Sequence, residues 1–101
     1  MARAPRTVLE LATRRLGVHR GALAAAHIAQ WAIVTAELGH VPTTVEYSEW
    51  WAVDERTGWR HRASCRDVLG DDWQTVVQQI AGVIAAKQAR SPRAVMGLVV
   101  A

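Results

Sequence analysis

Cysteine and long apolar runs are scarce in this chain of 101 residues, and each scarcity excludes a class of protein. Lysine occurs only once. The single cysteine rules out an intramolecular disulfide framework and is typical of a reducing compartment. No segment approaches the roughly 18–20 consecutive apolar residues that a membrane-spanning helix needs. The N-terminus is basic but lacks the apolar stretch of a signal peptide. We therefore expect a soluble cytoplasmic protein with no membrane segment.

The residue patterns on which catalysis and cofactor binding depend are also missing. The sequence shows no paired carboxylates, no glycine-rich phosphate loop and no Ser/His/Asp set. His19, His40 and His61 do not have the spacing to Cys65 that a zinc site requires. We therefore expect neither an enzyme nor a bound metal or other cofactor.

Arginine, in contrast, is abundant and unevenly distributed. The formal net charge is +3, the pI is about 10.0, and 11 of the 12 basic residues are arginines. Residues 1–20 contain five arginines against one glutamate, and residues 56–66 contain four arginines and no acid, whereas residues 21–55 are net acidic. Two such basic blocks form one nucleic-acid-binding surface if the fold brings them together.

Apolar residues at helical spacing, separated by glycine and proline, predict an all-α fold of four to five helices in a single domain. The predicted helices cover residues 6–16, 22–38, 44–52, 55–69 and 72–90. The apolar, β-prone segment 95–100 predicts either a short C-terminal strand or a tail that docks on a partner.

Short polar side chains and glycines mark the predicted helix ends. Thr43 or Thr44 is the expected N-cap of the third helix, with Glu46 near its start as in a capping box, and Asp54 is the expected N-cap of the fourth. The expected stops are Gly17, Gly39 and Gly70.

The aromatic and sulfur-containing residues mostly belong to the expected core. Helical spacing places Trp31, Tyr47, Trp51 and Trp73 inside, together with a hydrogen-bonded His27 and a small, unreactive Cys65. The neighbouring Trp50 and Trp51 point to different helix faces, so we expect Trp50 or Trp59 to be exposed at a dimer or DNA surface.

The third and fourth predicted helices have the spacing of a helix-turn-helix at about residues 43–69. The stretch TVEYSEWWAVDERTGWR resembles the pattern T-x-x-E-x-A-x-x-x-G-V-S-x-R-T-x-Y-R of DNA-binding helix-turn-helix domains. Ser48 takes the small position where the helices cross, and Asp54 takes that of the usual Ser cap. Together with GHVPTTVEY, the stretch resembles small actinobacterial and actinophage regulators of the phage repressor or Cro type, over about residues 39–70.

Two positions depart from that pattern. Ala52 replaces the glycine of the turn, so the backbone there either avoids the left-handed region or carries slight strain. Gly58 stands where an apolar core residue is usual. Glycine inside a helix costs about 1 kcal/mol of stability relative to alanine. We expect Gly58 to make room for one of the nearby tryptophans.

The resemblance implies a sequence-specific transcriptional regulator of double-stranded DNA that reads the major groove with helix 55–69. The expected base contacts are Glu55, Arg56, Arg60 and His61. The expected contacts with the DNA backbone are Arg14, Arg15, Arg20, Thr43, Thr44, Thr57 and Arg62.

One such motif reads few base pairs, so a homodimer on a palindromic operator is expected, with residues 72–101 as the candidate dimerisation helix and tail. Two alternatives remain open at this point. The first is an excisionase or recombination-directionality factor, which uses the same motif to bend DNA. The second is a helical protein-interaction module, such as an antitoxin or inhibitor, whose basic face binds an acidic protein rather than a specific DNA site.

Overall fold

The structure, a computed structural model, describes residues 7–90 and confirms the all-α prediction. Its helices are α1 (Val8–Leu16), α2 (Val18–Leu38), α3 (Thr44–Trp51), α4 (Glu55–Leu69) and α5 (Trp73–Arg90). No strand occurs within these residues, and the strand predicted at 95–100 lies outside them.

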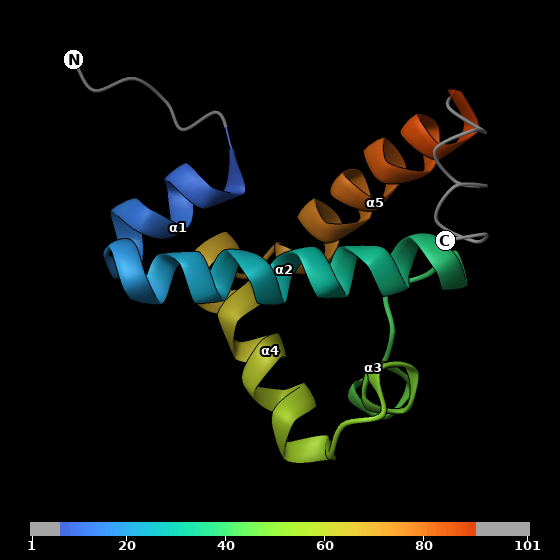
Figure 1. Ribbon diagram of the computed structural model, residues 1–101, viewed down its shortest axis with the longest axis horizontal. Coiled ribbons are helices and arrows are strands. Elements are labelled where there is room, and N and C mark those ends of the chain that lie inside the picture. Colours follow the sequence, from blue (N-terminus) through green and yellow to red (C-terminus); the bar gives the residue numbers. More distant parts are fainter. Residues whose placement is uncertain (1–6, 91–101) are drawn as a thin grey trace, which may run out of the picture.

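The long helix α2 is the centre of the molecule, and each of the other helices contacts it (Figure 1). In that view α1 and α5 lie above α2, while α4 descends from it toward α3. The approach of α1 to α2 is close, because a Cβ on Gly21 would lie 2.7 Å from the Thr13 backbone. Gly17 ends α1 with a positive φ of 86° and leads directly into α2.

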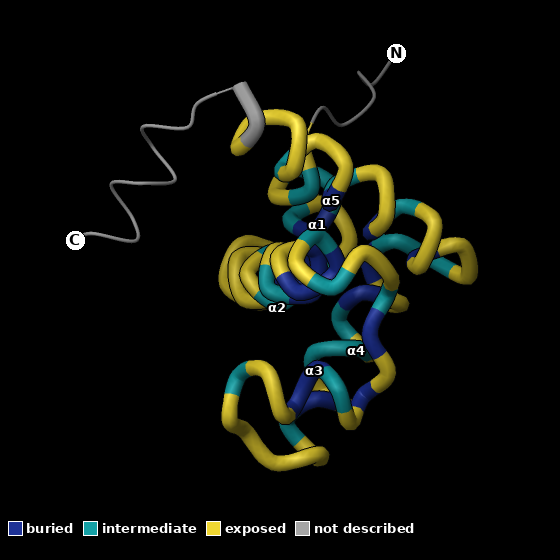
Figure 2. Tube along the Cα trace, turned by 90° about the vertical axis from the view of Figure 1, so that its right-hand side faces the viewer, coloured by how far each residue is buried: buried dark blue, intermediate teal, exposed yellow. Residues whose placement is uncertain are grey.

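Aromatic side chains from three helices form the middle of the core. The Trp31 ring of α2 stacks on Tyr47 of α3 at 4.3 Å between centroids and meets Trp73 of α5 edge-on at 5.5 Å. Cys65 and Val68 of α4 are fully buried beside them. The buried segments accordingly converge between α2, α4 and α5 (Figure 2). The predicted core positions of Trp31, Tyr47, Trp73 and Cys65 are confirmed.

Local hydrogen bonds fix both ends of α3 and the start of α4. The Thr43 hydroxyl accepts from the Glu46 amide, and the Glu46 carboxylate accepts from the Thr43 amide, so the predicted capping box is present. The Asp54 carboxylate accepts from the Thr57 amide at 2.8 Å and caps α4 as predicted. Residues 52–54 therefore form a short turn that holds the two helices as a helix-turn-helix unit.

The turn uses the left-handed conformation that its sequence disfavours. Ala52 has φ 54° and ψ 45°, and it is the only non-glycine residue with positive φ among residues 7–90. A left-handed alanine costs roughly 1–2 kcal/mol, because its Cβ approaches the following carbonyl oxygen. The Val53 amide donates to the Ser48 carbonyl at 3.0 Å, and this bond closes the turn despite the strain.

Gly58 lies at the crossing of α3 and α4, which corrects the expectation that it makes room for a tryptophan. A Cβ on Gly58 would overlap the Ser48 hydroxyl oxygen and lie 3.0 Å from the Thr44 methyl group. The crossing therefore needs a small residue on each helix, and Ser48 has the role that the sequence pattern predicts.

Candidate nucleic-acid interface

The outward face of α4 carries a row of side chains that no other helix covers. Arg56, Trp59, Arg60 and Ala63 are all exposed there. Within residues 7–90 no ion pair or hydrogen bond engages the guanidinium of Arg56 or Arg60. Both groups are therefore accessible to a ligand, and their predicted base contacts stay predictions.

Acidic groups stand at the N-terminus of the same helix. Glu55 is exposed in the first turn, where it is favourable next to the positive end of the helix dipole. Hydrogen bonds from the Thr57 side chain and amide, with smaller contributions from Arg56 and Arg60, lower the pKa of Asp54. Asp54 is thus anionic and already occupied as a cap, so Glu55 is the free carboxylate of this end.

His61 is half-buried, with its Nδ1 on the inward side of α4, and its expected base contact stays a prediction. Its Nδ1 is hydrogen-bonded to the Tyr47 hydroxyl, and its ring stacks on His27 at 3.8 Å between centroids. His27 in turn bonds to the Ser64 hydroxyl at 2.8 Å. Burial lowers the pKa of both histidines, and for His27 the nearby His61 adds to the effect. These contacts join α2, α3 and α4, so the pair helps to set the position of α4.

The threonines expected at the DNA backbone are placed differently from one another. Thr43 is exposed, with its hydroxyl oxygen accepting at the cap of α3. The Thr44 methyl packs beside Gly58, and the residue also lines the depression next to Arg62. Thr57 is half-buried and its amide is held by Asp54. The predicted phosphate contacts of all three threonines stay predictions.

Arg62 lies between two tryptophan rings. Its guanidinium carbon is 5.1 Å from the Trp59 ring centroid and 5.2 Å from that of Trp73. Such cation–π contacts contribute about 0.5–1 kcal/mol each at exposed sites. A depression of about 410 Å³ adjoins this group, with Arg62, Trp59 and the start of α3 among its lining residues. The predicted phosphate contact of Arg62 stays a prediction.

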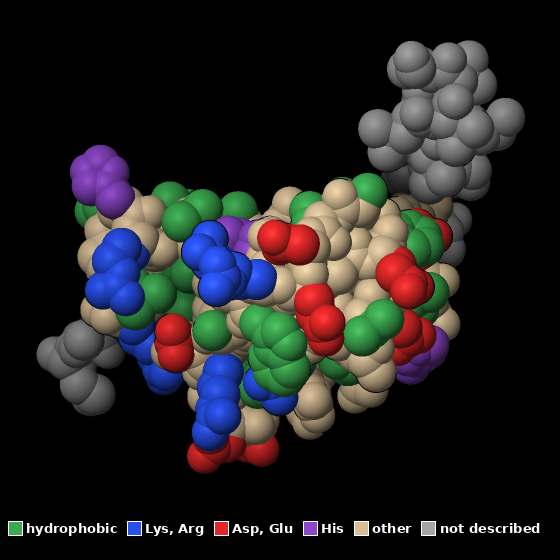
Figure 3. Space-filling view, turned by 90° about the horizontal axis from the view of Figure 1, so that it is seen from below, with side chains coloured by type: hydrophobic (Ala, Val, Ile, Leu, Met, Phe, Trp, Pro, Cys, Tyr) green, Lys and Arg blue, Asp and Glu red, His purple; other side chains and the backbone are tan. Residues whose placement is uncertain are grey.

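The basic residues from the N-terminal part lie in the α1–α2 region, and α1 contacts α4. Arg14 and Arg15 end α1, Arg20 lies in the first turn of α2, and all three are exposed. Figure 3 shows the visible arginine and lysine side chains gathered on the left of one face, with a few acidic groups among them. The right of that face shows acidic side chains and no basic ones.

Trp59 is exposed on this face, in line with the expectation that Trp50 or Trp59 lies at the surface. Its side chain is 52% exposed, whereas Trp31 and Trp73 are buried. The signal lies in the helical spacing, because residue 59 is one turn from Glu55 and Arg56 on the outward side. A second exposed tryptophan, Trp50, lies on α3 and is 46% exposed.

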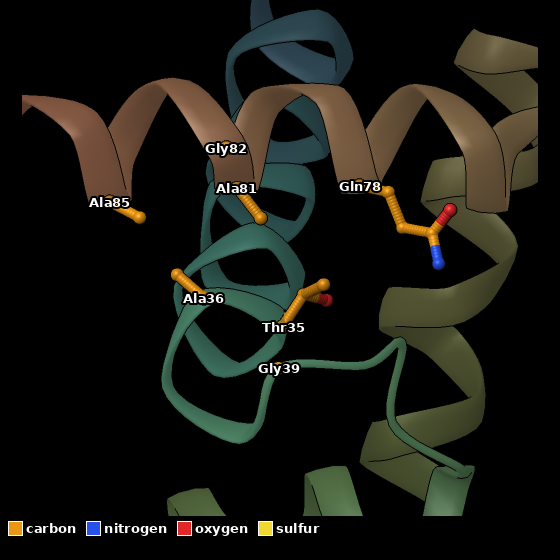
Figure 4. A pocket seen from close by; sticks show the side chains of 7 residues that line it. All are labelled: Thr35, Ala36, Gly39, Gln78, Ala81, Gly82 and Ala85. Carbon is orange, nitrogen blue, oxygen red and sulfur yellow. The ribbon is translucent and has the colours of Figure 1, made fainter.

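The candidate dimerisation helix α5 packs against α2 and leaves a shallow groove of about 330 Å³ between them. Small residues line it from both helices, and the side chains of Ala36 and Ala81 point into the gap (Figure 4). Val83, on the same helix, is exposed. The C-terminal tail that completes the predicted dimer surface lies outside the described residues.

Two further observations on residues 7–90 concern metal ions and membranes. No group of three or more His, Cys, Asp or Glu side chains is placed to hold a metal ion. In the same part of the chain, no helix combines the length and apolarity needed to cross a membrane.

Comparisons with protein-family models, curated proteins and solved structures found no match to the chain.

Proposed function

We propose that the chain is a sequence-specific transcriptional regulator that binds double-stranded DNA and reads the major groove with α4. The carrying observation is the outward face of α4, where Arg56 and Arg60 stand unpaired on a helix fixed by its cap and by the Gly58 crossing. An α-helix fits the major groove, and side chains in its N-terminal half reach base edges.

The charges around α4 support the same proposal. Arg14, Arg15 and Arg20 are exposed where α1 meets α2, and α1 contacts α4. They add cations that can contact phosphates beside the groove. A single α4 covers few base pairs, so the proposed binding unit is a homodimer on a palindromic operator, with α5 at the interface. A dimer by light scattering or sedimentation at micromolar concentration supports that interface, and a monomer on and off DNA contradicts it.

The test is an affinity comparison between two single-charge variants. Wild-type protein first enriches a duplex from a random library, and binding to it is then measured for Arg60→Ala and Arg66→Ala. Both positions are exposed arginines of α4, but Arg66 lies in its last turn, where its guanidinium is 3.8 Å from the Asp71 carboxylate. Loss of a bidentate guanine contact costs about 1–3 kcal/mol, or roughly 5- to 150-fold in Kd.

Arg60→Ala is expected to show that loss on the enriched duplex and a much smaller one on random duplex, while Arg66→Ala changes both little. Equal losses on both duplexes, with a steep dependence on salt, would reduce α4 to a phosphate-binding surface. Absence of binding to any duplex would instead favour the protein-interaction module. A bending assay on the enriched duplex separates a regulator from an excisionase-like factor.

A further inference from the structure

The central residue of the outward α4 face is aromatic. Trp59 is 52% exposed, with Arg56 and Arg60 toward one edge of the face and Arg62 toward the other. Ala63, one turn further along, is exposed and small, so the surface beyond the indole stays low. A single exposed apolar side chain is common on protein surfaces, but tryptophan is enriched at interfaces, and this ring lies among the arginines that are proposed to read base edges.

The indole is held in place before any ligand arrives. The Arg62 guanidinium lies over the Trp59 ring and also over Trp73, whose side chain is 4% exposed and part of the core. Arg62 thus ties the exposed ring to a fixed one. Side-chain ordering on binding normally costs affinity, and a ring already ordered avoids much of that cost.

The neighbours of Trp59 read a different kind of chemical group. Arginine and glutamate side chains recognise hydrogen-bond acceptors and donors on base edges. An indole face offers no donor or acceptor in the direction of its ring, so it distinguishes bases through apolar contact. In the major groove the apolar group is the 5-methyl of thymine, and protein contacts with it contribute to specificity.

Resting on the proposed function, we infer that Trp59 is a specificity-determining residue that selects thymine through its 5-methyl group. The binding site for α4 then contains a thymine at a fixed distance from the base that Arg56 or Arg60 reads.

The test removes single methyl groups from DNA. Each thymine of the enriched duplex is replaced in turn by deoxyuridine, which lacks only the 5-methyl, and Kd is measured for wild type, Trp59→Ala and the control Trp50→Ala. Trp50 is similarly exposed but lies on α3. Burial of one methyl is worth about fourfold in Kd, so wild type and Trp50→Ala are expected to weaken about three- to fivefold at one thymine per half-site.

Trp59→Ala is expected to bind the thymine and deoxyuridine duplexes equally. Circular dichroism confirms that each variant is folded. The inference is overturned if wild type tolerates every replacement, or if Trp59→Ala retains the full penalty, and in both cases tight binding to the enriched duplex leaves the proposed function standing. If no duplex is enriched, the proposed function fails and the inference fails with it.

Discussion

The crossing of α3 and α4 at Gly58 makes a quantitative prediction for the substitution Gly58→Ala. At an exposed helical position this change stabilises by about 1 kcal/mol, because alanine has the higher helix propensity. At Gly58 the added Cβ would overlap the Ser48 oxygen and lie 3.0 Å from the Thr44 methyl. Overpacking costs typically about 1–3 kcal/mol, and direct overlap with a buried oxygen belongs to the upper half of that range. After the gain of about 1 kcal/mol in helix propensity is subtracted, we expect a net loss of roughly 1–2 kcal/mol in the free energy of unfolding.

Substitution of the opposing serine tests the cause of that loss. The Ser48 Oγ is buried and has no hydrogen-bond partner among residues 7–90, so Ser48→Ala by itself is expected to be close to neutral or slightly stabilising. In the Ser48→Ala background the nearest obstacle to the new methyl is gone. Gly58→Ala should then cost less than about 0.5 kcal/mol, which gives a coupling energy of roughly 1–2 kcal/mol.

The assay is urea unfolding followed by circular dichroism for the four proteins of this cycle, with Gly82→Ala as the matched control. Gly82 lies inside α5 and a Cβ there meets nothing within 4 Å, so its substitution should stabilise by about 1 kcal/mol. The proposed crossing is refuted if Gly58→Ala stabilises like Gly82→Ala, or if its cost is unchanged by Ser48→Ala.

Three further predictions concern the turn, the histidines and the cysteine. Ala52→Gly should raise the free energy of unfolding by about 0.5–1 kcal/mol, seen as a higher urea midpoint, because glycine relieves the left-handed strain. A lower midpoint would contradict the left-handed conformation of residue 52. The lowered pKa values of His27 and His61 mean that the folded state binds fewer protons than the unfolded state, so stability should fall as pH drops through the ordinary histidine pKa of about 6.5. His27→Gln should flatten this slope between about pH 7 and 5, and an unchanged slope would exclude the pair as its source. Burial raises the pKa of Cys65 to about 12, so a thiol reagent at pH 8 should label it only after unfolding.

Most helix boundaries were predictable because the signals that set them are local, but α2 begins at Val18 rather than at residue 22 and contains Gly21. Thr43 and Glu46 are three residues apart and satisfy each other's backbone amides, and Gly39 ends α2 in the left-handed conformation. Such pairs act within one turn of chain, so the sequence displays both partners together. The role of Gly58 was missed because its partners, Thr44 and Ser48, lie on another helix, and their closeness depends on the crossing itself.

The contacts of His61 with Tyr47 and His27 were missed for a related reason. His61 follows Arg60 directly, and a basic run invites assignment of the whole stretch to one surface. Its spacing to Cys65 and Val68, four and seven residues on, places it on the inward side of α4. The polar character of histidine hid that pattern, since its burial is satisfied by Tyr47 through a bond between distant parts of the chain.

The two sides of α4 differ in how strongly packing constrains them, and this difference explains why the fold was easier to predict than the site. The inward side is constrained by volume and hydrogen bonding, since Gly58 must be small and His61 must meet Tyr47. The outward side has no such constraint within this chain, because Arg56, Trp59 and Arg60 lie outside the core. Packing within the chain therefore does not fix their identities, and the base preference that we propose for them has to be measured on DNA.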